Sequence, residues 1–169
     1  MPRRRNPRSQ RIMAVSIAAG IIGAVLGINA VLVPQKSDSE KYVLLLQEVS
    51  DQSMTLTQNY ESAIGKWRAG LIDNAEMLRI TDSNLEEIKS LISRLKAVEP
   101  PERFKEGHEM SILSLDYELQ SNTHMRKYIE TGNQYEYDKS TELLQLAFDY
   151  ESKAFQAFSE ASKHGNDKV

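Results

Sequence analysis

The longest apolar run of the chain lies near its start, from Ile12 to Val33. These 22 residues contain no charged side chain, and Ser16 and Asn29 are the only polar ones. A helix of this length reaches about 33 Å, which matches the hydrocarbon thickness of a bilayer. With Pro34 directly after it, the run predicts a transmembrane helix over residues 12–34.

Beyond this run, apolar positions recur at alternating steps of three and four residues, which is the spacing of an amphipathic helix packed in a bundle. Gly70, the pair Pro100 and Pro101, and Gly132 interrupt the repeat. Glycine just after a helix and proline in its first turn are typical boundary residues. Four helices are therefore predicted, at about residues 38–69, 74–98, 101–130 and 134–163, with a frayed tail at 166–169.

Three of these helices begin with the spacing of a capping box, in which two side chains satisfy each other's free backbone donors. The pairs are Ser37 with Glu40, Asp73 with Glu76 and Asn133 with Glu136. The connections between the helices are short, so consecutive helices should be antiparallel. No alternation typical of strands competes with this pattern. We therefore predict an all-α fold, an up-down-up-down four-helix bundle over residues 35–165.

The charges on the two sides of the apolar run predict its orientation. Residues 1–11 carry five arginines and no acidic residue, whereas all 24 acidic and 16 basic residues follow position 34 and give that part a formal net charge of −8. Short basic flanks stay in the cytoplasm. We therefore expect residues 1–11 to be a cytoplasmic tail and the bundle to be extracytoplasmic. An acidic domain of this kind repels nucleic acid.

A cleaved signal peptide is the alternative interpretation of the apolar run. Its hydrophobic core is usually shorter than this one. The best cleavage site ends at Ala30 but has the bulky Ile28 where a small residue is needed. These two features favour an uncleaved anchor in the cell membrane, spanning it once.

One face of the predicted anchor carries small residues. Ala19, Gly23 and Gly27 recur every four positions. Small residues allow two helix backbones to approach closely in lipid. The spacing indicates a helix–helix contact in the membrane, either with a second copy of the chain or with another membrane protein.

The sequence offers little of the chemistry that enzymes need. It has no cysteine, and His108 and His124 lie 16 residues apart on one predicted helix. That separation turns the two rings by about 160°, so they cannot share a metal. No nucleophile elbow or phosphate-binding glycine loop occurs. We therefore expect no catalytic residues, no metal and no cofactor, and a protein that is not an enzyme.

Four residues on the apolar seams are candidates for a ligand site or a polar core, namely Trp67, His108, Asn122 and Glu151. Core packing is the simpler explanation for Trp67, and an internal hydrogen bond for His108. Glu151 could pair with His108, Asn122 or Arg126. A paired buried acid more often fixes helix register than performs catalysis.

The segment from Val98 to His108, which reads VEPPERFKEGH, resembles a turn of uncharacterised membrane-anchored helical proteins of archaea and bacteria. The order of anchor, long helix, Pro-Pro turn and closing helix pair is similar as well. Small accessory proteins of ammonia-oxidising archaea have this layout, and the sensor modules of chemoreceptors are similar in outline. The resemblance implies an accessory role and carries over no functional residues.

Together these features predict a non-catalytic, membrane-anchored accessory or scaffolding subunit. Its partners would be the lipid bilayer and another membrane or cell-surface protein, or a second copy of the chain. The alternative is an extracytoplasmic, sensor-like helical module that binds a small ligand between its helices.

Overall fold

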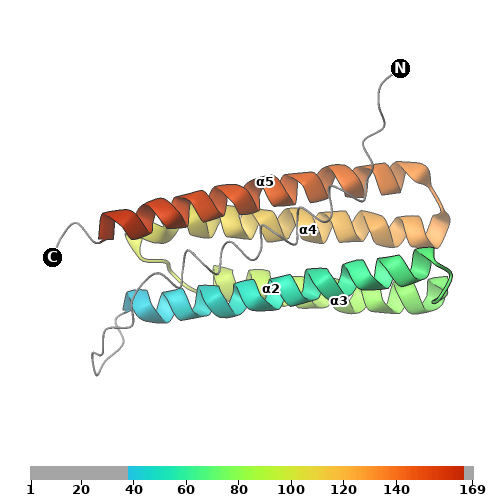
Figure 1. Ribbon diagram of the computed structural model, residues 1–169, viewed down its shortest axis with the longest axis horizontal. Helices are drawn as coiled ribbons and strands as arrows, with labels where there is room; N and C mark the ends of the chain where they lie inside the picture. The colour runs from blue at the N-terminus through green and yellow to red at the C-terminus, as the bar shows by residue number, and fades with distance from the viewer. Residues whose placement is uncertain (1–37, 166–169) are drawn as a thin grey trace, which may run out of the picture.

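The computed structural model describes residues 38–165 and contains four α-helices (Figure 1). One turn of 3-10 helix, η1 (Glu102–Phe104), precedes the third of them. The α-helices are α2 (Asp38–Arg68), α3 (Asn74–Lys96), α4 (Lys105–Thr131) and α5 (Gln134–Gly165). The prediction of an all-α fold is confirmed for the described part of the chain, as is the four-helix bundle.

Local signals place most helix ends where the sequence predicted them. The Asp73 carboxylate accepts from the backbone N–H of Glu76 at 2.8 Å and so caps α3. The Glu76 side chain, however, pairs with Arg79 instead of closing the capping box. Gly70 and Gly132 adopt φ angles of 71° and 69°, a left-handed conformation that glycine adopts without steric cost.

The start of the third helix differs from the prediction. Pro101 has φ −55° and ψ 145°, which is an extended conformation, and only the 3-10 turn η1 separates it from α4. The backbone N–H of Phe104 donates to the Pro101 carbonyl at 2.8 Å. Proline fits the first turn of a helix but also favours extended backbone, and here this turn aims the Phe104 ring into the core, where it is 2% exposed.

The bundle is built from two helix pairs, α2 with α3 and α4 with α5, which meet where α3 packs on α4 (Figure 1). The fourth side is open, because no Cα atom of α2 lies within 8 Å of a Cα atom of α5. The side chains that face each other across this side include Ser50, Ser53, Thr57, Ala147 and Ala154. Such small side chains cannot span the gap that leucines would fill in a closed bundle.

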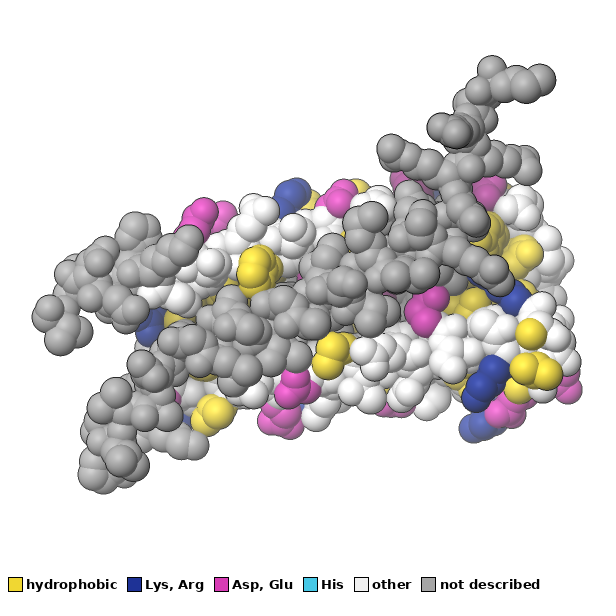
Figure 2. Space-filling model, viewed as in Figure 1, with side chains coloured by type: hydrophobic (Ala, Val, Ile, Leu, Met, Phe, Trp, Pro, Cys, Tyr) yellow, Lys and Arg dark blue, Asp and Glu magenta, His cyan; other side chains and the backbone are white. Residues whose placement is uncertain are grey.

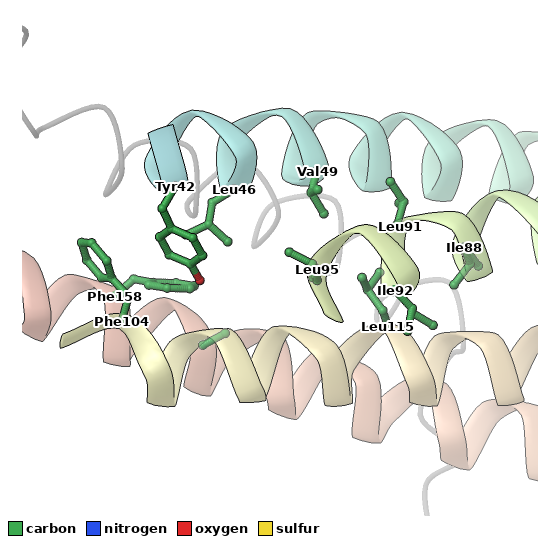
Figure 3. Packing of buried hydrophobic residues seen from close by; sticks show 11 residues of the cluster. Tyr42, Leu46, Val49, Ile88, Leu91, Ile92, Leu95, Phe104, Leu115 and Phe158 are labelled. Atoms are coloured by element: carbon green, nitrogen blue, oxygen red, sulfur yellow. The ribbon is translucent and has the colours of Figure 1, made fainter. Parts of the chain in front are cut away.

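Two apolar clusters form the core, and a polar pair separates them along the bundle. The first cluster has the stacked rings of Tyr42 and Phe104 at one end, with Phe158 beside them (Figure 3). The second lies toward the other end of the bundle. Between the clusters the Asn122 amide donates to the Asn84 side chain at 2.8 Å. A buried amide left without this partner would cost about 1–3 kcal/mol, so the pair fixes the register of α3 against α4.

No helix within residues 38–165 is both long enough and apolar enough to cross a bilayer. The predicted transmembrane segment, residues 12–34, lies outside the described residues. Acidic and basic side chains are interspersed on the face of the bundle that Figure 2 shows.

Candidate ligand-binding cleft

A cleft follows the open side of the bundle between α2 and α5, with α4 as its floor. It is lined by residues between Leu46 and Gln58 of α2, by residues between Ser111 and Glu118 of α4, and by residues between Ala147 and Phe158 of α5. Its volume is about 90 Å³. A single water needs about 10–15 Å³ on this scale, so the cleft has room for a small organic molecule.

Two carboxylic acids lie in this largely apolar cleft. Glu118 comes from α4 and Glu151 from α5, and they are close enough for the charge of Glu118 to raise the pKa of Glu151. Both side chains are partly buried. Two like charges at one desolvated site are unfavourable. The cleft therefore favours a state in which at least one of the two carries a proton.

The hydrogen bonds of Thr57 fit a protonated Glu118. The Thr57 hydroxyl oxygen lies 2.9 Å from Glu118 Oε1 and 3.0 Å from the Ser53 carbonyl oxygen. A hydroxyl has one hydrogen to donate. Both contacts are full hydrogen bonds only when Thr57 donates to the carbonyl and a protonated Glu118 donates to Thr57.

Burial raises the pKa of both carboxyls from an ordinary value of 4.5 to about 7. For Glu118, the hydrogen bond that Thr57 would donate to the ionised carboxylate opposes this rise in pKa, and the charge of Glu61 adds to it. For Glu151, the charge of Glu118 adds to it. Near neutral pH both carboxyls are therefore partly protonated, whereas an ordinary glutamate is ionised there.

The remaining polar groups of the cleft are hydroxyls and one side-chain amide. Neither lysine, arginine nor histidine is among the described residues that line it. Three of its hydroxyls already donate to main-chain carbonyls: Thr57 to Ser53, Ser111 to Gly107, and Ser114 to Ala147. Ser50, Ser53 and Gln58 also line the cleft and carry hydroxyl and amide donors, so what the described lining lacks is a positive charge.

His108, a candidate from the sequence, lies in the core. Its Nδ1 is hydrogen-bonded to the Tyr42 hydroxyl, with 2.9 Å between the two atoms. Burial lowers the pKa of His108 and raises that of Tyr42, so this pair is neutral. The simpler sequence interpretation, an interior histidine with a hydrogen bond, describes this geometry.

Trp67 and Asn122 also have partners within the bundle. Trp67 Nε1 donates to Asn74 Oδ1 at 2.8 Å, and Asn122 donates to Asn84. Trp67 belongs to the second apolar cluster, and neither residue lines the cleft. Of the four candidates, the structure places only Glu151 there.

The partners considered for Glu151 were wrong. His108 and Asn122 bond elsewhere, and Arg126 pairs with Asp82 and Glu130. The residue that faces Glu151 is Glu118, which sequence reasoning missed. The spacing along the sequence could have identified Glu118, because it lies three residues after Leu115 and four before Asn122. This is a seam position on the side of α4 that faces the cleft.

Within residues 38–162, no group of three or more histidine or acidic side chains could hold a metal ion. No family model matches the chain, and no curated protein or solved structure is significantly similar to it.

Proposed function

We propose that the protein is a membrane-anchored, extracytoplasmic helical module that binds a small ligand in the cleft between α2 and α5. The observation that carries this proposal is the open side of the bundle, where apolar walls surround two desolvated carboxyls. Concave, mostly apolar sites with a few polar groups of shifted pKa are typical of ligand-binding sites. The uncharged run at residues 12–34 supports the anchor.

Binding without chemistry is the simplest use of this cleft. A nucleophilic hydroxyl needs a base within hydrogen-bonding reach. Ser111 and Ser114 instead each have a main-chain carbonyl as acceptor, and Thr57 lies between the Ser53 carbonyl and a Glu118 carboxyl whose burial favours its protonated form. We therefore propose a non-catalytic role.

The test is a thermal-shift screen of the full-length chain in mild detergent against small organic molecules. A ligand at a hundred times its Kd should stabilise the fold by about 2.7 kcal/mol. We expect Ser53→Leu, which places an isobutyl group in the cleft, to abolish the shift. Ser62→Leu is the control, because Ser62 is exposed on the same helix and outside the cleft. A screen without hits, or a shift that survives in Ser53→Leu, would contradict the proposal.

A second proposal, an accessory subunit of a membrane assembly, is favoured by the small-residue face of Ala19, Gly23 and Gly27. Replacing both Gly23 and Gly27 with leucine should separate the helix backbones and shift the detergent-extracted chain to a smaller complex on native electrophoresis. Val25→Leu adds bulk on another face and should leave the complex unchanged. Equal migration of parent and double variant would argue against this proposal.

A further inference from the structure

We propose that the cleft takes an organic cation, a primary ammonium group on an apolar body, with the charge held by Glu118 and Glu151. This inference rests on the proposal that the cleft binds a small ligand, and it specifies the chemistry of that ligand.

The polar groups of the cleft match an ammonium group in both charge and hydrogen bonding. Glu151 has no hydrogen-bonding or ion-pairing partner among the described residues, and no basic side chain lines the cleft. An ammonium supplies three N–H donors and a positive charge. It would thus supply the positive charge that the described lining lacks, together with donors for the two carboxyls.

The walls select for the rest of the ligand. Leu46, Val49, Phe148 and Phe158 line the cleft on either side of the carboxyls. They would exclude water from an alkyl or aryl body, a gain of about 25 cal/mol per Å² of apolar surface buried. A ligand carboxylate would face two acids without a counter-ion, and a neutral alcohol would gain nothing from their charge.

The charged groups around the site set how binding depends on pH. Glu61 of α2 acts on Glu118, and Glu118 acts on Glu151 of α5; α3 contributes only the apolar Leu95 to the cleft. The pKa of both carboxyls is about 7. A bound cation requires a carboxylate, so the ligand must displace a proton in acidic solution. For one carboxyl, affinity at pH 5.5 should be about thirtyfold below that at pH 8.

Three probes with the same hexyl body test the ligand class: hexylammonium, 1-hexanol and hexanoate. Calorimetric titration into the full-length protein should show binding of hexylammonium, about thirtyfold weaker at pH 5.5 than at pH 8. In buffers of different ionisation enthalpy at pH 6.5, the heat should reveal proton release. Hexanol should bind more weakly and without dependence on pH, and hexanoate should not bind.

Variants of the carboxyls separate charge recognition from apolar binding. Glu151→Gln and Glu118→Gln should each weaken hexylammonium at pH 8 at least tenfold and leave hexanol unchanged. Glu160→Gln, an exposed position on α5, is the matched control and should change nothing. Equal affinity for all three probes, abolished by Ser53→Leu, would overturn the cation and leave the binding cleft standing. If no probe binds, the cation is overturned, and the wider thermal screen decides on the cleft.

Discussion

Replacing Glu151 with glutamine is expected to raise the free energy of unfolding by about 2 kcal/mol at pH 8 and by only about 0.5 kcal/mol at pH 5. Glutamine has nearly the shape of a protonated glutamate but never ionises. Glutamine therefore removes the free-energy cost of holding a carboxylate in the cleft at every pH at which Glu151 is ionised.

The direction follows from the pKa of the carboxyl in each state. In the folded protein the pKa of Glu151 is about 7, against an ordinary value of 4.5. The folded state thus binds the proton more tightly, and this contribution to stability is complete below pH 4.5 and lost as the pH rises through 7. The whole shift corresponds to about 3 kcal/mol, which the partial exposure of the side chain reduces.

Urea denaturation of parent and variant at both pH values measures this difference. His108 has a lowered pKa, so its contribution to stability is lost as the pH falls and opposes that of the carboxyls. Comparing variants at one pH cancels this effect, since His108 is present in both. Glu160→Gln should show no pH-dependent difference. A Glu151→Gln offset of equal size at pH 5 and pH 8 would mean that the carboxyl is ionised throughout.

Sequence reasoning succeeded where the determining interactions are local. The Asp73 cap and the left-handed glycine at Gly132 each depend on contacts within a few residues, so their spacing alone predicts a boundary. It failed at Pro101, because proline is compatible with both a first helical turn and an extended segment. There the burial of Phe104 against α2 and α5, which no local pattern records, accompanies the extended geometry.

The cleft was beyond prediction for the same reason. A heptad pattern identifies the face of each helix that is buried, but not the distance between two faces. That distance depends on which side chains meet. Ser50, Ser53, Ala147 and Ala154 line the space between α2 and α5, and their small side chains do not fill it. Glu151 could be identified as an unusual seam residue, but Glu118 becomes its neighbour only once α4 and α5 are packed.

The second large effect is expected from alanine substitutions at Gly107 and Gly65, which should change the free energy of unfolding in opposite directions. The reason is the close approach of Gly107 to Phe158. A Cβ atom on Gly107 would lie 2.7 Å from two carbons of the Phe158 ring, whereas one on Gly65 would meet nothing within 4 Å. Both sites are inside helices, where alanine is favoured over glycine by about 1 kcal/mol. Gly65→Ala should therefore raise the free energy of unfolding by about that amount.

At Gly107 the gain in helix propensity is outweighed by overpacking. The Phe158 ring is 4% exposed and packs near Phe104, so moving it costs about 3 kcal/mol, the upper part of the usual range. Gly107→Ala should then lower the free energy of unfolding by about 2 kcal/mol in urea denaturation. Because Phe158 also lines the cleft, a ring displaced toward it should weaken ligand binding as well. If Gly107→Ala proved as stable as Gly65→Ala, the ring would have free space behind it, and the tight contact between α4 and α5 at this end of the bundle would be wrong.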